Sequence, residues 1–435
     1  MKMHALFVFA AVVAIAAAGE YSGYQTLRIT PRSQADLKVL RDFERESTLL
    51  DFWQSTKSLQ KTVDILVPPA LSTDVKDFLE NHGIEFRIGI QDVQQLIDLQ
   101  AEERKNSVQS TAGFDYYRYN TYEEIRQWVY DFAAEHSDLI SVHDVAESFE
   151  GRPIALMKIG NPRQDGTVKK AVYYQGGIHA REWLSPATVI LIIKQMVEGY
   201  EAGDNDVKLL LDTFDYYIVP QLNADGYDYT WKQPQFRLWR KNRHTFEDKL
   251  CDGVDLNRNY PVGFGAGNGA SGITCGYTYH GEGPFSEKEL FDISVYLNNL
   301  KDVDGVEFVH FIDFHTYSQL LLGPWSYSDS VPDPPDVVDQ TAAGDAAAQA
   351  LAAVDGCTYT VGPSAKTLYE AAGCSNDWGY HSEMGLNAKY SYVMELRDEG
   401  EYGFLIPDSY IDVSGRETYE AVKAFGAWIL AEYGN

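Results

Sequence analysis

The sequence is short of basic residues, and this shortage limits the partners that the protein can have. Its 435 residues include 36 Lys and Arg against 64 Asp and Glu, which gives a formal net charge of −28 at pH 7. Binding to nucleic acid depends on cationic side chains that neutralise phosphates. The sequence contains neither a basic patch nor a nucleic-acid-binding signature, so no nucleic-acid partner is expected.

Long apolar segments are also missing, apart from one near the N-terminus. Residues 5–18 form an unbroken apolar run that follows Lys2 and ends in three alanines before Gly19. About 14 apolar residues are fewer than the ~20 of a membrane-spanning helix, and this pattern is typical of a secretory signal peptide. The sequence therefore predicts a signal peptide over residues 1–18 and a secreted, extracellular protein without a membrane partner. A buried N-terminal helix is the alternative.

Cysteine is scarce, with four residues that all lie in the second half of the chain. They lack the Cys-x-x-Cys spacing of structural zinc sites, so we expect disulfides instead. Four cysteines allow three connectivities. We favour Cys251–Cys275 and Cys357–Cys374, because both pairs close short loops.

Residues 19–105 form a small first unit in which predicted strands and helices alternate. The strands are expected at residues 24–30, 63–67 and 85–90, and the helices at 33–47, 71–82 and 91–105. Ser33 is suited to cap the first helix, and Ser72 or Thr73 the second. This order predicts a ferredoxin-like α/β domain. It contains no plausible catalytic cluster.

A polar stretch, residues 101–113, follows this unit and contains the dibasic pair Arg104-Lys105. Exposed basic residues between two compact units are sites where a trypsin-like protease can cut. A plain interdomain linker is the alternative interpretation.

Residues 106–435 show a different pattern, with buried-looking strands and longer helices. Strands are expected at residues 171–175, 216–221 and 307–314, and helices at 185–200, 285–299 and 417–432. This rhythm predicts an α/β domain with a mixed, mostly parallel sheet flanked by helices. Polar and Gly-rich residues follow the strand ends, where such sheets place their sites.

Two of these strand ends carry candidate metal ligands. His179 and Glu182 follow the strand at residues 171–175, and His315 ends the strand at residues 307–314, in which His310 is expected to be a core residue. Two imidazoles and one carboxylate with an open fourth position are typical of catalytic zinc. The sequence therefore predicts a site for one zinc ion.

Several motifs occur in the same order as in the metallocarboxypeptidase A/B family, and the sequence resembles that family over nearly its whole length. The motifs are SFEGRPI (148–154), GIHAREW (177–183), RLWRKNR (237–243), GVDLNRNY (253–260), HTYSQLLL (315–322) and MELRDEGEYGFLIP (394–407). The first unit is similar to the inhibitory propeptide of the family. The resemblance implies a secreted zinc procarboxypeptidase of the invertebrate digestive type, acting in a digestive lumen as a monomer. It also implies two protein partners, an activating trypsin-like protease and proteinaceous carboxypeptidase inhibitors.

The resemblance assigns roles to residues of these motifs. Glu395 becomes the general base, a role that a carboxylate at the end of a strand can fill. Arg240 becomes the residue that stabilises the oxyanion. Asn257 and Arg258 become the clamp for the terminal carboxylate of a peptide, and Arg181 a more peripheral substrate-binding residue.

Other positions of the family pattern fall on the substrate pocket. Tyr369 corresponds to a mobile tyrosine that covers the bound end group, Tyr317 lines the adjoining subsite, and Phe404 lines the same cleft. The pocket for the terminal side chain falls on three uncharged polar residues, namely Ser326, Ser364 and Asn376.

Asn376 fits neither the aliphatic nor the acidic pattern of the two family subtypes. Without an acidic partner a buried Lys or Arg head group is costly, so we expect an A-like or broad neutral preference. The alternatives are a B-like enzyme that prefers C-terminal Lys or Arg, an inactive zinc-binding relative, and a deacylase on the same scaffold.

Overall fold

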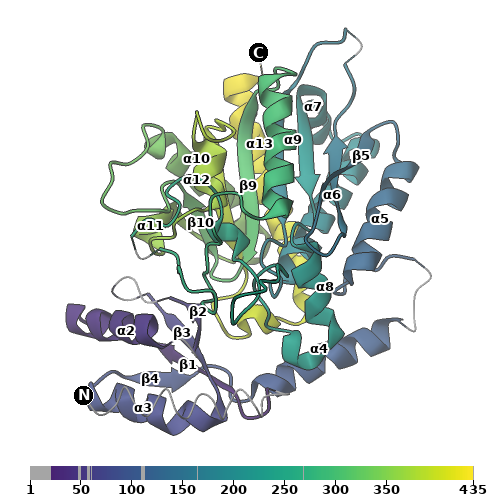
Figure 1. Ribbon diagram of the computed structural model, residues 1–435. Helices are drawn as coiled ribbons and strands as arrows, with labels where there is room; N and C mark the ends of the chain where they lie inside the picture. Colours follow the sequence, from purple (N-terminus) through teal and green to yellow (C-terminus); the bar gives the residue numbers. More distant parts are fainter. Residues whose placement is uncertain are drawn as a thin grey trace.

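A computed structural model of the protein describes residues 21–47, 50–55, 59, 61–108, 113–163, 165–267 and 269–434. The predicted signal peptide lies outside these residues. The described chain forms a small N-terminal unit, drawn in purple in Figure 1, and a larger unit that it lies against. None of the helices in this part of the chain combines the length and the hydropathy of a membrane-spanning helix.

The N-terminal unit is a four-stranded antiparallel sheet in the order β2-β3-β1-β4 with two helices. Its elements are β1 (Gln25–Ile29), α2 (Gln34–Glu46), β2 (Asp51–Gln54), β3 (Val63–Val67), α3 (Ser72–Asn81) and β4 (Phe86–Ile88). The alternation predicted from the sequence is confirmed. Strand β2 was not predicted, although its residues contact the larger unit.

The two helices of this unit begin in different ways. At α2 the side chain of Ser33 accepts a hydrogen bond from the Asp36 backbone and Asp36 reciprocates, which forms the expected capping box. The prediction of a Ser72 or Thr73 cap at α3 is wrong. Both residues lie inside α3, which follows directly on a 3-10 turn over Pro69–Leu71 and has no side-chain cap.

Helix α4 (Val93–Val108) connects the two units, and Figure 1 shows it running beneath the larger one. It continues past residue 105, where the predicted helix ends, and the dibasic pair lies inside it, as expected for a helix over residues 91–105. The Arg104 guanidinium bonds Glu124 at 3.1 Å and the Tyr119 carbonyl at 3.1 Å, and it lies 4.7 Å from the Trp231 ring. Only Lys105 of the pair is exposed.

The larger unit is built on an eight-stranded mixed sheet in the order β11-β10-β12-β9-β7-β8-β6-β5. Its strands are β5 (Ile140–Glu147), β6 (Pro153–Ile159), β7 (Lys170–Gly176), β8 (Phe214–Val219), β9 (Phe308–Thr316), β10 (Leu320–Gly323), β11 (Thr360–Pro363) and β12 (Tyr390–Leu396). The central strands β12, β9, β7 and β8 are parallel to one another. This arrangement confirms the predicted mixed sheet.

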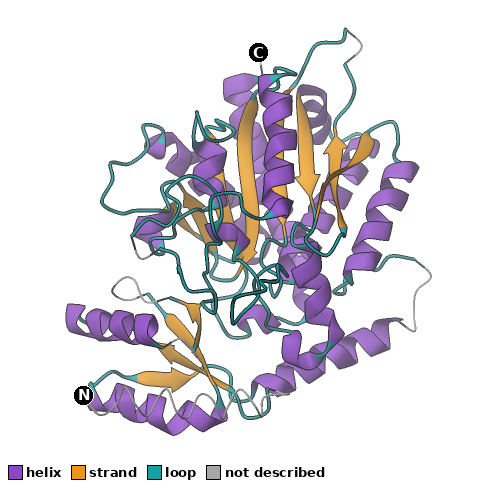
Figure 2. Ribbon diagram, viewed as in Figure 1, coloured by secondary structure: helices purple, strands orange, loops and turns teal. Residues whose placement is uncertain are grey.

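Helices cover both faces of this sheet (Figure 2). The helices of this unit are α5 (Tyr122–Glu135), α6 (Leu184–Glu201), α7 (Asn205–Thr213), α8 (Ala224–Lys232), α9 (Lys288–Asp302), α10 (Val337–Asp355), α11 (Ser364–Thr367), α12 (Ser375–Tyr380) and α13 (Ile411–Tyr433). Helices α6, α7 and α10 all pack on α13. Successive residues of β9 point to opposite faces of the sheet. The His310 ring contacts Phe425 of α13 on one face, and the Phe311 ring contacts Trp378 of α12 on the other.

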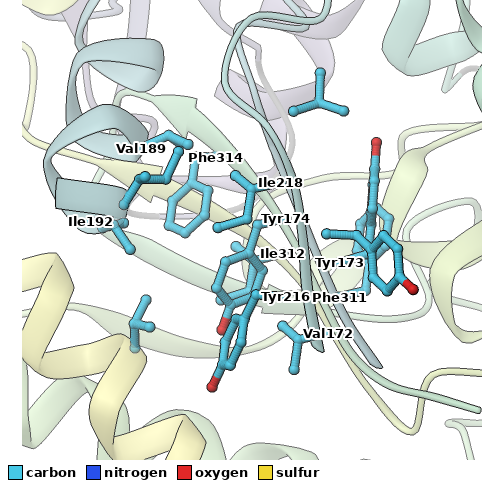
Figure 3. Packing of buried hydrophobic residues seen from close by; sticks show 14 of the residues in the cluster. Val172, Tyr173, Tyr174, Val189, Ile192, Tyr216, Ile218, Phe311, Ile312 and Phe314 are labelled. Atoms are coloured by element: carbon cyan, nitrogen blue, oxygen red, sulfur yellow. The ribbon is translucent and has the colours of Figure 1, made fainter. Parts of the chain in front are cut away.

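The main core lies between the central strands and these helices. Figure 3 shows Val189 and Ile192 of α6 close to Phe314 of β9, with the rings of Tyr174 and Tyr216 beside them. All are buried. Since both faces of these strands are buried, β7, β8 and β9 are rich in apolar and aromatic residues.

One of the two predicted disulfides forms. Cys251 and Cys275 are bonded, whereas Cys357 and Cys374 are both free and buried, so the predicted second pair is wrong. Sequence separation misled the prediction because β11 and α11 lie between the two cysteines. Cys357 lies among groups of α10 and α13, and Cys374 lies against the backbone of Asn257.

Candidate metal centre and active-site cleft

The candidate metal ligands and Glu395 lie together at the carboxyl ends of three adjacent parallel strands. Strand β9 pairs with β7 on one side and with β12 on the other. His315 and Glu395 are register partners across β9 and β12, so their side chains project to the same face. His179 follows three residues after the end of β7. The topology therefore brings residues that are far apart in the sequence to one sheet edge.

A glycine turn directs the loop after β7 toward this edge. Gly177 has φ +68°, and a Cβ there would lie 2.3 Å from Gln221 Oε1, so only glycine fits. Asn223 Nδ2 donates to the carbonyls of Ile178 and Lys241, each at 3.1 Å. The backbone N–H of Ala180 donates to the Arg240 carbonyl at 3.0 Å. These bonds connect the loop of His179 and Glu182 to the segment that carries Arg240.

The three predicted ligands converge with one donor atom each. His179 Nδ1 lies 2.7 Å from Glu182 Oε1, and His315 Nδ1 lies 3.1 Å from His179 Nδ1 and 3.2 Å from Glu182 Oε2. All three side chains are buried. Two imidazole nitrogens and a carboxylate oxygen within 4.8 Å of one another match the donor set of catalytic zinc.

Two further carboxylates hold the outer nitrogens of the histidine rings. His179 Nε2 lies 3.0 Å from Asp255 Oδ1, and His315 Nε2 lies 3.0 Å from Asp313 Oδ2. Carboxylates in this position fix the tautomer and the orientation of metal-binding histidines. Burial raises the pKa of Glu182, but His179 and His315 outweigh it and hold that pKa well below its usual range.

Sequence reasoning missed both of these carboxylates. Asp313 precedes His315 by two residues on β9, and the two-residue repeat of a strand was a signal that both face the same side. Asp255 lies in the GVDLNRNY motif, but no pattern in the sequence predicted the atoms that it contacts. Its second oxygen accepts from Arg240 Nε at 3.1 Å and Nη2 at 3.0 Å. A single carboxylate thus orients a metal ligand and a guanidinium.

Glu395 faces the same cavity as the triad. Burial raises its pKa to about 8, an effect that Glu182 enhances and His315 and Arg240 oppose. A divalent cation held by the triad would favour the ionised form of Glu395, because a bound ion is the largest local charge. The carboxyl group is therefore placed to gain and lose a proton.

A cavity of about 50 Å³ joins the triad and Glu395 to the predicted substrate-binding residues. Those that line it are Arg240, Asn257, Arg258, Tyr317, Ser326, Ser364, Tyr369 and Phe404. The Arg258 guanidinium is held from behind, with Nε donating to the Gly269 carbonyl at 2.9 Å and Nη1 to the Asn257 carbonyl at 2.7 Å. The Asn257 side chain accepts from the Ser375 N–H at 2.8 Å.

Two of the predicted substrate-binding residues, Asn376 and Arg181, do not line the cavity. Asn376 is fully buried behind the pocket wall, where its oxygen accepts from Ser326 Oγ at 2.8 Å and its nitrogen donates to the Leu322 carbonyl at 3.2 Å. The structure therefore presents Ser326, rather than Asn376, to a ligand. Arg181 is buried against the N-terminal unit.

The comparison with known proteins agrees with this geometry. Residues 125–421 match the family model described as zinc carboxypeptidase, and residues 27–100 match the one described as carboxypeptidase activation peptide. The chain belongs to the zinc carboxypeptidase family. It is the precursor form of a zinc metallocarboxypeptidase, with the activation peptide at its N-terminus.

Relatives of both subtypes are similar to this carboxypeptidase. Carboxypeptidase A2 of Mus musculus is 38% identical over 406 residues, which are 93% of each chain. Carboxypeptidase B of Bos taurus is 34% identical over 415 residues, 94% of each chain. The crystal structure of the carboxypeptidase A from Helicoverpa armigera is 26% identical with a TM-score of 0.84, and the match covers 95% of this chain and 99% of that one. Overall similarity therefore does not decide between A-like and B-like specificity.

The activation peptide occupies the outer side of the cleft. The Asp51 carboxylate of β2 accepts hydrogen bonds from Arg181, and Asp64 of β3 accepts one from the Tyr317 hydroxyl at 2.7 Å. The Trp53 ring lies 5.0 Å from the Phe404 ring, and both line the cavity. Three predicted substrate-binding residues of the carboxypeptidase thus have partners in the activation peptide.

Helix α4 extends this interface. Gln100 Nε2 donates to the Ile406 carbonyl at 2.9 Å, and Gln100 Oε1 accepts from Arg237 Nε at 3.0 Å. Apolar residues of both units form one cluster around these bonds, and they include Leu66, Ile90, Val93, Ile97, Leu238 and Leu405. Burial of apolar side chains supplies most of the free energy of such contacts.

Proposed function

We propose that the protein is a secreted zymogen that becomes a carboxypeptidase when the activation peptide is cut from the catalytic domain. In this proposal residues 1–18 are the signal peptide, residues 19–105 the activation peptide and residues 106–435 the catalytic domain. The activated enzyme hydrolyses the C-terminal peptide bond of proteins and peptides and releases single residues. The observation that carries the proposal is that the His179–Glu182–His315 triad, Glu395 and Arg258 line one cavity.

The three ligands would hold zinc through two nitrogens and one carboxylate, with a position left open. When bound, zinc polarises the scissile carbonyl and lowers the pKa of a water molecule. Glu395 takes the proton of the attacking water and passes it to the leaving amine. Its position beside His315 at the sheet edge supports this role, because the proton must move next to the metal ligands.

Two arginines supply positive charge at different points of the cavity. Arg240 is fixed by Asp255, and its Nη1 lies 3.7 Å from the ligand Glu182, so it can stabilise the negative charge that develops on the carbonyl oxygen. Arg258 binds the terminal carboxylate of the substrate, for which a planar guanidinium is well suited. Tyr369 closes over the bound end group.

The walls of the terminal pocket favour an uncharged side chain. Among the described residues that line the cavity, the acids are Glu182 and Glu395, and both lie at the metal end. The other end has the apolar Leu322, Leu368, Ala371 and Val393 beside Ser326 and Ser364. Asp377 accepts N–H bonds from Ser326 and Tyr327 and does not line the cavity. A Lys or Arg side chain would therefore be buried without a partner charge, which is costly. We infer a preference for apolar and aromatic C-terminal residues.

Latency follows from the contacts of the activation peptide. Asp51 bonds Arg181, Asp64 bonds Tyr317, and the Trp53 ring packs on the Phe404 ring. In the precursor these contacts cover the outer cleft, so a peptide substrate cannot lie along it. A trypsin-like protease acting near Arg104 is the proposed activator. Secretion is supported by the signal-like N-terminus and by the Cys251–Cys275 disulfide, and a digestive lumen stays a prediction from the family resemblance. Proteinaceous inhibitors that enter the same cleft stay a prediction.

The test is a kinetic panel on the activated enzyme with peptides that differ only in the C-terminal residue, namely Lys, Phe, Leu, Gln and Glu. We expect kcat/KM to be highest for Phe and Leu and at least about 100-fold lower for Lys, as for an unpaired buried charge. A matched peptide with an amidated C-terminus should not be cut. Glu395→Gln should keep its zinc and lose hydrolysis by at least about 100-fold. Near-normal turnover by Glu395→Gln would remove that residue from the base role.

A further inference from the structure

One of the two free cysteines lies at the substrate-binding cavity. Cys374 immediately precedes α12, is 3% exposed and contributes to the cavity wall next to Arg258. Cys357, the other free cysteine, is buried as well but is not part of that wall. The chain thus contains a matched pair of buried thiols, one inside the cleft and one outside it.

The sulfur of Cys374 contacts the clamp directly. Its Sγ lies 3.4 Å from the Asn257 carbonyl oxygen and 3.2 Å from the Ala371 carbonyl oxygen, so the thiol hydrogen has an acceptor. Arg258 Nη1 points toward the same sulfur at 3.6 Å. Burial raises the pKa of this thiol to about 12, so it stays neutral and does not cancel the charge of Arg258.

These contacts fix one edge of the Arg258 guanidinium. Nε is held by the Gly269 carbonyl, and Nη1 is held by the Asn257 carbonyl and the Cys374 sulfur. Because Nε and Nη1 are engaged by the protein, a terminal carboxylate meets the guanidinium at Nη2, and its affinity depends on how well the guanidinium plane is held. A small change behind Nη1 therefore acts on binding of the terminal carboxylate.

The backbone just before Cys374 packs closely on the segment that carries Arg258. Gly373 has φ +71°, and a Cβ at that position would lie 2.4 Å from the Arg258 carbonyl oxygen. The Gly373 carbonyl also accepts the Tyr260 N–H at 3.1 Å. The sulfur, held by the Ala371 and Asn257 carbonyls, forms part of the pocket wall, and its volume limits the side chain that fits.

We propose that Cys374 is a positioning residue for Arg258 and a specificity-determining residue of the terminal pocket. Its thiol holds the clamp in the plane that receives the terminal carboxylate, and the sulfur restricts the size of the terminal side chain. This inference rests on the proposed function, because it assumes that the cavity receives the C-terminal residue of a peptide.

The experiment compares the activated wild type, C374A, C374S and the control C357A on peptides that end in Leu, Phe or Trp. For C374A we expect KM to rise about 5-fold for all three peptides with kcat within about 2-fold, because one contact of a charged group is lost. We also expect the Trp-to-Leu ratio of kcat/KM to rise by about 3-fold or more, because the wall recedes by a sulfur atom.

The conservative variant separates the two effects. The hydroxyl of C374S can still accept from Arg258, so its KM should return toward the wild-type value, while its smaller oxygen should still raise the Trp-to-Leu ratio. C357A should change neither quantity. Zinc content and thermal unfolding are measured for every variant, and if C374A is unstable, an unchanged Trp-to-Leu ratio in C374S overturns the inference.

The inference is overturned if C374S and a stable C374A both keep the wild-type KM and the wild-type Trp-to-Leu ratio while wild type is active. It is also overturned if C357A shifts the ratio as much as C374A does. A wild-type enzyme that releases no C-terminal residue contradicts the proposed function itself, so the two failures are distinguishable.

Discussion

Asp51 of the activation peptide forms a buried ion pair with Arg181. Arg181 lies between Ala180 and Glu182 in the metal-binding loop. The Arg181 side chain is 1% exposed, and its guanidinium lies 4.1 Å from the centroid of the Phe404 ring. A charge buried so completely depends on its partner, because losing one member of such a pair costs about 3–5 kcal/mol. The same pair docks the activation peptide and covers a residue that the family resemblance assigns to substrate binding.

Asp51→Asn should raise the carboxypeptidase activity of the uncut precursor. The substitution leaves the Arg181 charge buried without a countercharge, so the activation peptide should dock less tightly. We expect the activity of the intact precursor on a small C-terminal substrate to rise by about 10-fold or more. Gel electrophoresis before and after the assay confirms that the chain is uncut.

Asp77→Asn is the matched control for this prediction. Asp77 is an exposed residue of α3 in the same unit, and its neutralisation should leave latency unchanged. Equal activity of the Asp51→Asn and wild-type precursors would show that the ion pair does not maintain latency.

Glu124→Gln should accelerate cleavage at the dibasic pair. A protease needs an extended chain, so the last turn of α4 must unwind and Arg104 must leave Glu124 before cutting. A partly exposed ion pair contributes up to about 1 kcal/mol, which corresponds to cleavage that is about 3-fold to 5-fold faster. The introduced amide oxygen can still accept the Thr121 N–H, so the capping box of α5 is kept.

The control for the cleavage experiment is Glu123→Gln, one residue earlier in the same helical turn. Glu123 is exposed, so the Glu123→Gln precursor should be cleaved at the wild-type rate. The measurement is the loss of intact precursor over time at a limiting concentration of trypsin. An unchanged rate for Glu124→Gln would mean that Arg104 does not limit access.

The sequence predicted the catalytic scaffold better than the contacts between units. Strands β7 and β9 and the ligands at their ends were predictable because a buried parallel strand is an apolar run that stops where the polar site begins. The contacts of β2 were not predictable, because Asp51 and Trp53 meet Arg181 and Phe404, which lie more than 100 residues later in the chain. The predicted pairing of Cys357 with Cys374 failed because residues that are close in sequence need not be close in space.

The two histidines of β9 should differ in their effect on the metal. His315→Ala removes a proposed ligand and should lower zinc affinity by more than about 100-fold, whereas His310→Gln should keep one zinc per chain. Asp313→Asn, which weakens the support of His315 Nε2, should fall between them with a loss of about 10–100-fold. Zinc is measured by elemental analysis after dialysis against a buffered chelator. Full zinc in His315→Ala would contradict the ligand assignment.

His310 should make the stability of the protein depend on pH. Burial lowers its pKa to about 3, and its ring is surrounded by Tyr174, Tyr392 and Phe425. An unfolded histidine has a pKa of about 6.5, so between pH 6.5 and pH 3 the unfolded chain binds a proton that the folded chain does not. The contribution is therefore fully present above pH 6.5 and is lost as the pH falls toward 3. At pH 5 the loss is about 2 kcal/mol.

His310→Gln isolates this contribution. The introduced amide retains an acceptor for the Tyr174 hydroxyl but loses the ring packing, so the variant should be less stable than wild type at pH 8. Its further loss of stability between pH 8 and pH 5 should be about 2 kcal/mol smaller than that of wild type, because the variant has no buried imidazole to protonate on unfolding. His143→Gln, at an exposed histidine of β5, should follow the wild-type pH dependence. Urea unfolding at the two pH values measures the difference, and parallel curves for wild type and His310→Gln would show that His310 is not the group that titrates.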